Sequence, residues 1–402
     1  METRRFTHED LAEATAVLRA GGVVAVPTET VYGLCCSGLD ARAVERIYGL
    51  KGRPAVKPLS LMIHDFAAAE RYCIFVPTGA QALADRFLPG PLTIVLPARE
   101  TVPDIVRAGG DTVGLRCPDH PLTLELLREL DAPLAGPSAN PSGAPSPRSA
   151  QAVLDYFDGQ IEGVLDGGEC AVGVESSIID MSKTPYRILR VGALSEETVF
   201  AALESAMTVI GVTGGTGSGK TTALEAVREQ GGLVIDCDAV YHELLRTDRE
   251  LLGVLDARFP GVIRGGVLDR KALGGIVFAD PAALLDLNAL THGAVRREVD
   301  RRLQDWAKMG GELAAVDAIA LFESGLGERC THTLAVTAPR ERRVERLMRR
   351  EGISRDYAEK RIDAQKSDTY FAERCDKILI NDGTLESLRE KCRAQITEWT
   401  GR

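Results

Sequence analysis

The sequence lacks any apolar run of the roughly 20 residues that a membrane span requires. Its first ten residues are too polar for a secretory signal, so we expect a cytoplasmic protein without a membrane segment. Nine cysteines are present, but none form a C-x-x-C pair, and the adjacent Cys35 and Cys36 are poorly placed to bridge each other. We interpret the cysteines as small buried side chains in a reducing compartment and expect no zinc site.

The chain also has no excess of positive charge, because its net charge at pH 7 is −10. Residues 1–205 carry 18 Lys and Arg against 27 Asp and Glu, whereas the remainder carries 30 against 31. Sequence-independent affinity for nucleic acid comes largely from the neutralisation of phosphates. The acidic first half therefore argues against direct binding of nucleic acid, while a local basic pocket for a nucleotide stays open.

What is present is the composition of a globular protein, with 45% hydrophobic and 26% charged residues, and 402 residues suffice for two or three domains. Strand-like and helix-like segments alternate in the first half, which predicts an α/β domain. The expected strands are 22–28, 59–63, 92–97, 112–117, 163–166, 176–181 and 186–191. The expected helices are 8–20, 40–50, 78–87, 119–130, 148–156 and 195–205.

The segment 133–148 contains five prolines and has the composition of a linker. Strand-like segments nevertheless continue beyond it, so we place the domain boundary at 203–208 instead. The predicted domains are 1–205 and 206–402. The second is expected to contain further strands near 313–317, 333–337 and 377–380.

A phosphate-binding loop opens the second domain. Residues 214–221 read Gly-Gly-Thr-Gly-Ser-Gly-Lys-Thr, which satisfies G-x-x-x-x-G-K-[ST], and a strand-like and a helix-like segment flank them. The backbone N–H groups of such a loop surround nucleotide phosphates, and the following helix adds its positive end. Lys220 is expected to reach the β- and γ-phosphates, and the Thr221 hydroxyl to bind Mg²⁺. The expected ATP-binding residues are Gly215, Thr216, Gly217, Ser218, Gly219, Lys220, Thr221 and Thr222.

Three further features indicate a small-molecule kinase. Asp236 and Asp238 end the next strand-like segment, where a carboxylate faces the acceptor hydroxyl, although either could instead cap a helix. Eight arginines between 340 and 361 suit a lid over phosphates, although neighbouring glutamates could make most of them a solvated face. No guanine-reading N-K-x-D segment follows the loop.

By these motifs the second domain resembles the dephospho-CoA kinase family over about 207–395. The likeness includes segments 234–239, 268–273, 276–278, 290–292, 321–323, 346–350, 364–365 and 381–383. The family transfers the γ-phosphoryl group of ATP to the ribose 3′-hydroxyl of dephospho-CoA. The resemblance implies a P-loop kinase with a parallel sheet and a helical lid. It also implies that Asp238 is the catalytic base, that Lys220 is catalytic and that Arg350 is an ATP-binding lid residue.

The sequence departs from this family at two positions near the acceptor. Gly293 follows His292 where the family usually has proline, and Ile319 stands where it usually has the proline before Leu-Leu-Phe-Glu. Both departures bear on acceptor binding and leave the ATP site intact. A kinase for another nucleotide-like acceptor, or a regulatory ATP-binding module, stays the alternative for this half.

The first half has no phosphate-loop motif. Its basic and hydroxyl side chains gather at the expected ends of strands and helices, where α/β proteins bind ligands. Such groups suit a phosphate ligand, although the same residue types are common in turns and caps. The residues concerned are Thr28, Thr30, Lys51, Arg53, Lys57, Thr112, Arg116, Ser138, Asn140, Glu175, Ser176 and Ser177.

Residues 26–34 read Val-Pro-Thr-Glu-Thr-Val-Tyr-Gly-Leu and resemble the opening signature of the threonylcarbamoyl-AMP synthase family, also called the YrdC-like domain. Lys51-Gly-Arg53, Ser138-Ala-Asn140 and later segments extend the resemblance over about 8–195. It implies an α/β domain with a mixed, twisted sheet. It also implies catalytic roles for Lys51 and Arg53, ATP binding by Lys51, Arg53, Ser138, Asn140 and Arg190, and threonine binding by Thr30, Arg116 and Ser176.

The family joins threonine, bicarbonate and ATP into threonylcarbamoyl-adenylate, which feeds a tRNA modification, and releases pyrophosphate. Cationic side chains and Mg²⁺ would neutralise the departing pyrophosphate. The product would pass to a tRNA threonylcarbamoyl-transferase complex, so this resemblance requires no direct contact with tRNA. One departure is Ser177, where many members have threonine. A sister-type protein without synthase activity, or an RNA-binding module, stays the alternative for this half.

Overall fold

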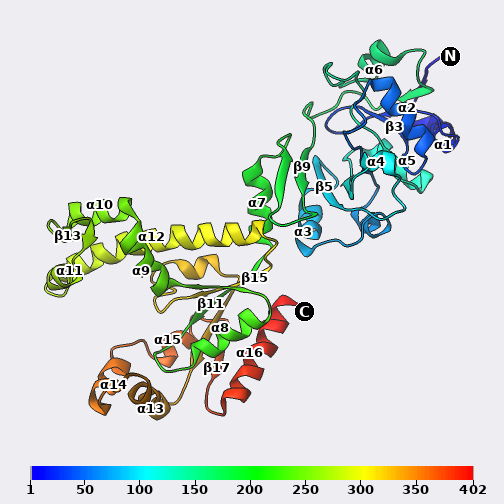
Figure 1. Ribbon diagram of the computed structural model, residues 1–402. Coiled ribbons are helices and arrows are strands. Elements are labelled where there is room, and N and C mark those ends of the chain that lie inside the picture. The colour runs from blue at the N-terminus through cyan, green and yellow to red at the C-terminus, as the bar shows by residue number, and fades with distance from the viewer. Residues whose placement is uncertain (1, 402) are drawn as a thin grey trace. The chain divides into compact units, whose positions relative to one another are not determined.

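The computed structural model describes residues 2–401, whose contacts divide into two compact units. The first unit is Met1–Ala206 with Lys308–Gly310, and the second is Met207–Ala307 with Gly311–Arg402. Both units are α/β, which confirms the predicted fold class (Figure 1). Among the described residues, no helix combines the length and apolarity that a membrane crossing needs.

The first unit is built on a mixed sheet, as predicted. Its described strands are β1 (Arg4–Phe6), β2 (Val24–Val26), β3 (Gly33–Ser37), β4 (Ser60–Met62), β5 (Leu92–Pro97), β6 (Thr112–Arg116), β7 (Leu134–Ala135), β8 (Gly163–Leu165), β9 (Ser177–Asp180) and β10 (Arg187–Arg190). They follow the order β1-β8-β2-β3-β7-β4-β6-β5-β9-β10. The pairs β4–β6 and β5–β9 are parallel, whereas β5–β6 and β9–β10 are antiparallel.

Helices and short 3-10 segments connect these strands. They are η1 (His8–Asp10), α1 (Leu11–Arg19), α2 (Ala41–Lys51), η2 (Phe66–Arg71), α3 (Thr78–Phe87), α4 (Asp104–Arg107), α5 (Pro121–Leu130), α6 (Ala150–Phe157) and α7 (Glu196–Ser205). The Asp40 side chain accepts hydrogen bonds from the backbone N–H groups of Arg42 and Ala43, the second and third residues of α2, and Gly52 ends that helix with a φ of 56°. These two caps set Lys51 and Arg53 at the C-terminal end of α2.

Two local expectations for this unit need correction. The helix expected over 8–20 begins only at Leu11, because Asp10 accepts a hydrogen bond from the Thr7 backbone N–H and so caps a 3-10 turn. The strands β1, β3 and β7 were not expected: β1 and β7 have only three and two residues, and β3 consists of Gly, Leu, Cys and Ser. The proline-rich segment is part of the fold and no linker, since β7 within it pairs with β3 and β4.

The second unit is built on a parallel sheet, also as predicted. Its strands are β11 (Thr208–Thr213), β12 (Leu233–Asp236), β15 (Leu313–Asp317), β16 (His332–Thr337) and β17 (Lys377–Ile380), with a separate hairpin of β13 (Ile263–Arg264) and β14 (Val267–Leu268). The strand order is β12-β15-β11-β16-β17, and every pairing among the described residues of this sheet is parallel. The carboxyl ends of β11, β12 and β15 therefore lie side by side at one edge.

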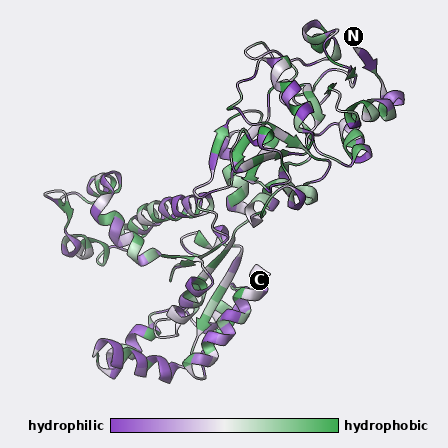
Figure 2. Cartoon of the chain, turned by 45° about the vertical axis from the view of Figure 1, so that its right-hand side comes forward, coloured by the Kyte–Doolittle hydropathy of each residue, from purple (hydrophilic) through white to green (hydrophobic). Residues whose placement is uncertain are grey.

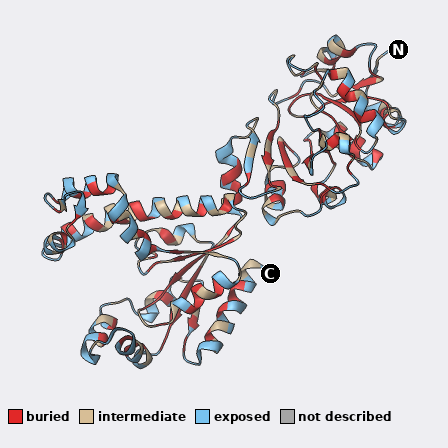
Figure 3. Ribbon diagram, in the orientation of Figure 1, coloured by how far each residue is buried: buried red, intermediate tan, exposed pale blue. Residues whose placement is uncertain are grey.

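The helices of the second unit complete its core and a lid. They are α8 (Lys220–Glu229), α9 (Cys237–Thr247), α10 (Arg249–Arg258), α11 (Arg270–Val277), α12 (Pro281–Lys308), η3 (Leu326–Arg329), α13 (Arg340–Glu351), α14 (Arg355–Asp363), α15 (Asp368–Ala372) and α16 (Leu385–Thr400). Helices α8 and α16 lie side by side and pack Val227 and Ile396 against strand residues such as Ile210. The central strands β15, β11 and β16 are almost wholly buried, whereas the edge strands β12 and β17 keep exposed residues (Figure 3).

Helices α13 and α14 form a small lid with its own core. Val344, Leu347, Ala358 and Ile362 pack between the two helices. The remaining positions are mainly charged, so these helices are predominantly purple in the hydropathy view (Figure 2). An apolar cluster this small gives limited stabilisation. The lid is consequently the kind of element that can move relative to the sheet.

Gly293 provides a direct test of helix stability in the second unit. It lies inside the continuous helix α12, and a Cβ at this position would meet only the flexible end of Arg297, at 3.8 Å. Glycine in a helix interior costs about 1 kcal/mol relative to alanine. We therefore expect Gly293→Ala to raise the free energy of unfolding of this unit by about 1 kcal/mol. Chemical denaturation measures this, and an unchanged or lower stability would contradict it.

Candidate active sites

The phosphate loop joins the end of β11 to the start of α8. Gly214 has a φ of 133°, and a Cβ there would lie 2.2 Å from the Val336 carbonyl oxygen, so no side chain fits. Gly219, with a φ of 110°, is the cap residue from which α8 begins at Lys220. The positive end of α8 thus lies within the loop, which is the arrangement that binds phosphate groups.

A polar pocket lies over this loop. Its walls include eight of the nine predicted ATP-binding residues, Arg350 among them, together with Asp238. Thr222 is the exception among the predictions, because it is buried on α8 and does not line the pocket. The remaining lining residues are Asp236, Asp317, Ile319, Arg346, Arg349 and Arg361.

Three carboxylates at the sheet edge have different environments. Asp236 accepts a hydrogen bond from the Ala239 backbone N–H, so it acts as the cap of α9. Asp238 lies on the first turn of α9 and is exposed. Asp317 ends β15, where burial raises the pKa of its carboxyl to about 6, Lys220 opposes that rise, and Asp236 and Asp238 add to it. Of the three carboxylates, Asp238 neither caps a helix nor is buried.

Asp317 was not predicted as a site residue, and its environment makes stability depend on pH. The pKa of its carboxyl is about 6 in the folded protein, above the ordinary value of 3.8. The folded state therefore binds this proton more tightly, so stability from this group is present at low pH and is lost as pH rises through 6. We expect Asp317→Asn to stabilise the nucleotide-free protein at pH 7.5 by on the order of 2 kcal/mol, and much less at pH 4.5.

Denaturation curves at the two pH values measure the effect. Asp356→Asn, on the exposed surface of α14, is the control for loss of one negative charge. A stability difference between wild type and Asp317→Asn that does not change with pH would contradict the expectation.

The lid arginines make three kinds of contact, and Arg346 makes two of them. Arg340 and Arg355 pair with acidic residues of the lid, which is the solvated-face alternative. The buried Arg343 donates from Nε to the Thr216 carbonyl oxygen at 3.0 Å, and Arg346 donates to the Gly217 carbonyl oxygen at 3.0 Å. The group that lines the pocket consists of Arg346, Arg349, Arg350 and Arg361. Only part of the cluster is thus placed to meet phosphates.

A second, more apolar pocket adjoins the first. Asp238 and Ile319 line both pockets, so the carboxylate lies where the two meet. The side chains that line only the second pocket include Cys237, Tyr241, Leu287, Thr291, His292, Val295 and Leu326. Burial lowers the pKa of His292. Of the two departures noted in the sequence, Ile319 is half exposed on the shared wall, whereas Gly293 lies outside both linings.

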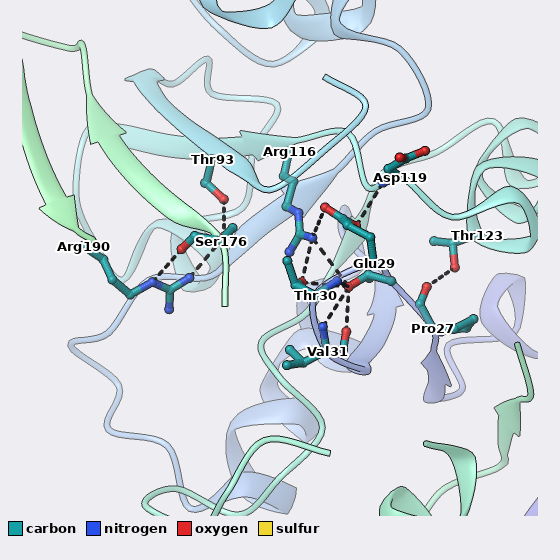
Figure 4. Close-up of polar contacts among 11 residues, drawn as sticks. Pro27, Glu29, Thr30, Val31, Thr93, Arg116, Asp119, Thr123, Ser176 and Arg190 are labelled. Atoms are coloured by element: carbon teal, nitrogen blue, oxygen red, sulfur yellow. Dashed lines mark hydrogen bonds and ion pairs between the residues drawn. The ribbon is translucent and has the colours of Figure 1, made fainter. Parts of the chain in front are cut away.

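The first unit has a pocket at the ends of four neighbouring strands. Arg116 ends β6, Thr93 lies on β5, Ser176 immediately precedes β9 and Arg190 ends β10. Because these strands are adjacent in the order β6-β5-β9-β10, their side chains meet (Figure 4). Five predicted site residues line this pocket: Arg53, Arg116, Ser138, Ser176 and Arg190.

Arg116 is held from one side only. Its Nη2 donates to Glu29 Oε1 and to Thr30 Oγ1, both at 2.8 Å, and the side chains of Arg116 and Glu29 are 8% and 10% exposed. The Nε of Arg116 is buried and makes no hydrogen bond to any residue the structure describes. Thr30, which was predicted to bind threonine, accepts a hydrogen bond from Arg116 and is not among the residues that line the pocket.

Arg190 and Ser176 form a second polar group in this pocket. Arg190 Nε donates to the Ser176 carbonyl oxygen at 2.9 Å and Nη2 donates to Ser176 Oγ at 3.1 Å. Ser176 Oγ also lies 3.0 Å from Thr93 Oγ1, and Arg190 pairs with Glu175. The serine hydroxyl is thereby fixed between two strands and an arginine (Figure 4).

Lys51 and Asn140 lie behind the pocket wall. The Lys51 ammonium group donates to the carbonyl oxygens of Ser138 and Asn140, and lies 3.5 Å from Asn140 Oδ1. Burial, assisted by the charge of Arg53, lowers the pKa of Lys51 to about 8. In this arrangement Lys51 holds the segment that carries Ser138, and neither Lys51 nor Asn140 lines the pocket.

Sequence reasoning assigned no specific role to four lining or supporting residues, of which Glu175 was named only among the candidate groups. Asp317 could have been found, because it ends an expected strand beside the phosphate-loop strand in a parallel sheet. Glu29 and Glu175 lie within motifs that were recognised, but nothing in the motifs shows that each pairs with an arginine. Thr93, the second residue of β5, carries no signal of this kind.

Comparison with known proteins separates the same two halves. The Sua5/YciO/YrdC family model, described as telomere recombination, matches residues 16–192, and the dephospho-CoA kinase family model matches residues 208–387. The threonylcarbamoyl-AMP synthase of Pyrococcus abyssi is 48% identical over 186 residues, which are 46% of this chain and 55% of the relative. The chain thus spans about half the length of that relative.

The second half matches its relatives over most of their length. The dephospho-CoA kinase of Moorella thermoacetica is 38% identical over 195 residues, which are 48% of this chain and 92% of the relative. Among solved structures, Pyrococcus abyssi Sua5 complexed with L-threonine matches with a TM-score of 0.49 and 28% identity, covering 81% of this chain and 96% of that one.

Proposed function

We propose that this chain, which belongs to the dephospho-CoA kinase family over residues 208–387 and carries a Sua5/YrdC domain over residues 16–192, is a bifunctional enzyme that consumes ATP in both halves. We assign the synthase to residues 1–205 and the kinase to residues 206–402. Separate pockets, lined by different residues, support two independent reactions.

The second half phosphorylates the ribose 3′-hydroxyl of dephospho-CoA. The observation that carries this proposal is the position of Asp238 on the wall shared by the phosphate pocket and the apolar pocket. ATP phosphates lie on the loop, and the acceptor lies in the apolar pocket. Asp238 then takes the proton of the acceptor hydroxyl as the hydroxyl oxygen attacks the γ-phosphorus, the bond from this phosphorus to the bridging oxygen breaks, and ADP leaves. Lys220 and the pocket arginines neutralise the charge on the transferred group.

The pocket also has the chemistry for Mg²⁺. The exposed Thr221 hydroxyl and the Asp317 carboxylate line it, and such oxygen ligands together with ATP phosphates are what Mg²⁺ prefers. When bound, the ion would neutralise phosphate charge. The protein's own part is to present these oxygens and to position ATP against Asp238.

Phosphorylation of the acceptor is tested with the full chain, ATP, Mg²⁺ and dephospho-CoA. Formation of CoA supports the proposal. The alternative of another nucleotide-like acceptor is tested in parallel with adenosine and AMP as acceptors. Phosphorylation of either of these in preference to dephospho-CoA would assign a different substrate, and ATP binding without transfer to any of the three would indicate a regulatory module.

The first half forms threonylcarbamoyl-adenylate from threonine, bicarbonate and ATP. The observation that carries this proposal is a pocket in which Arg116 and Ser176 stand near Arg53 and Arg190. Arg116 and Ser176 bind the threonine, while Arg53 and Arg190 neutralise the phosphates. Threonine and bicarbonate form the threonine carbamate with loss of water. A carbamate oxygen then attacks the α-phosphorus of ATP and pyrophosphate leaves, a step that requires two reactants held in line and protected from water. Lys51, proposed as catalytic with Arg53, and Asn140 complete the proposed ATP site from the wall behind the phosphates.

Release of pyrophosphate measures this reaction. It should require both threonine and bicarbonate when ATP is supplied. Release without threonine, or no release at all, would favour the sister-type alternative. The product is a small labile molecule, so we propose that it passes to a tRNA threonylcarbamoyl-transferase complex and that the chain itself does not hold tRNA.

A further inference from the structure

The pair between Glu29 and Arg116 is an unusual use of a buried arginine. A carboxylate commonly meets a guanidinium with both oxygens, occupying two N–H groups at once. Here only Glu29 Oε1 reaches Arg116, at Nη2, because Glu29 Oε2 accepts a hydrogen bond from the Asp119 backbone N–H at 3.0 Å. Glu29 is therefore shared between an arginine and the backbone just before α5 (Figure 4).

Because Glu29 contacts only Nη2, the Nε–H of Arg116 makes no hydrogen bond to any described residue. The hydrogen bonds that Arg116 makes to Glu29, Thr30 and Thr28 all leave from Nη2. Its Nε is buried and unpartnered among the described residues, in a side chain that lines the pocket. A buried donor without an acceptor costs free energy, so such a group in a pocket indicates a ligand.

We propose that Glu29 is a positioning residue for the threonine site, which fixes Arg116 by Nη2 so that the Nε–H stays available to the carboxylate of the substrate. This rests on the proposed synthase function. Glu29 does not touch the substrate. It neutralises the buried guanidinium while the pocket is empty, and the Asp119 N–H prevents it from taking the second donor.

The chain offers a matched control for this role. Glu162 makes the same two contacts as Glu29, since it accepts from Arg46 Nη1 at 2.7 Å and from the Val23 backbone N–H at 2.7 Å. Neither Glu162 nor Arg46 lines the pocket. Glu162→Gln therefore removes an equivalent Arg–Glu–backbone contact in the same unit without affecting Arg116.

The test compares wild type, Glu29→Gln, Glu29→Asp and Glu162→Gln as full chains. Calorimetric titration gives the Kd for L-threonine, and pyrophosphate release gives kcat and the KM values for threonine and ATP. Without Glu29, Arg116 no longer presents its Nε–H to the threonine carboxylate, and loss of one such charge-assisted hydrogen bond weakens binding by about tenfold or more. We expect Glu29→Gln to raise the threonine Kd and KM by about tenfold or more, with the ATP KM nearly unchanged. Glu29→Asp, which keeps the charge, should fall between, and Glu162→Gln should match wild type.

Each result decides the matter. A threonine KM in Glu29→Gln equal to that of wild type overturns the proposal, as does an equal loss for threonine and ATP, which would indicate general damage to the fold. If thermal unfolding shows that Glu29→Gln does not fold, Glu29→Asp carries the test, and an unchanged threonine Kd there overturns the proposal. Failure of wild type to bind L-threonine would instead refute the synthase function itself.

Discussion

Replacing Lys220 by alanine is expected to lower kcat/KM for CoA formation by a factor of about 100 to 1,000. Lys220 begins α8 inside the phosphate loop, and its Nζ donates to the Gly214 carbonyl oxygen at 2.9 Å. Burial lowers the pKa of Lys220, although Asp317 and Asp238 counteract this. A charge held in such a place stabilises the transferred phosphoryl group far better than a solvated lysine could. A coupled assay for CoA formation measures the loss.

The same variant separates the two activities. Pyrophosphate release by Lys220→Ala should equal that of wild type, because Lys220 does not line the pocket of the first unit. Lys360→Ala, on the exposed surface of α14, is the control and should retain both reactions. Near-normal CoA formation by Lys220→Ala would refute the proposed site, and a parallel fall in pyrophosphate release would refute two independent sites.

Replacing Arg116 by alanine is expected to reduce threonine-dependent pyrophosphate release by a factor of about 100 or more, because it removes the proposed carboxylate-binding group. The change should also lower the free energy of unfolding of the first unit by about 3–5 kcal/mol, since Glu29 becomes a buried charge without its partner. Kinetics and denaturation measure the two effects separately. CoA formation by the second unit should persist under conditions in which both units are folded.

A double variant separates these two causes. Arg116→Met combined with Glu29→Gln replaces the ion pair with groups of similar size and no charge, so much of the lost stability should return. Activity should not return, because the carboxylate-binding donor is still missing. Recovery of pyrophosphate release in the double variant would show that Arg116 stabilises the fold and contributes little to the reaction.

The strong periodic elements and the phosphate loop could be predicted from the sequence because their signals are local. Segment 59–63, which is mainly apolar, contains β4. Segment 214–221 contains the glycines and the lysine that define the phosphate loop, so the motif can be read from eight consecutive residues. The short strand β7 could not be found this way. Its two residues lie among prolines, and their pairing with β3 and β4 depends on chain segments far away in the sequence.

The supporting contacts of the candidate sites were harder to predict for the same reason. The residues of the synthase motif were recognised, but motif membership does not distinguish a residue that lines a pocket from one that holds the wall. Lys51 and Thr30 are of the second kind, and Arg53 and Ser176 are of the first. Whether a motif residue lines the pocket or supports its wall depends on which acceptor its side chain reaches. These acceptors come from distant parts of the chain, so only the tertiary structure shows them.

The order of strands in the parallel sheet has a consequence for synthesis of the chain on the ribosome. Strand β11, which leads into the phosphate loop, has β15 and β16 as its neighbours, and Thr208 pairs with Leu313 about 100 residues later. A central strand gains its hydrogen bonds only when such partners exist, and long-range pairing is slow. The loop is therefore translated early and organised late, so a nascent chain that ends before β15 cannot yet hold ATP in the pocket described above.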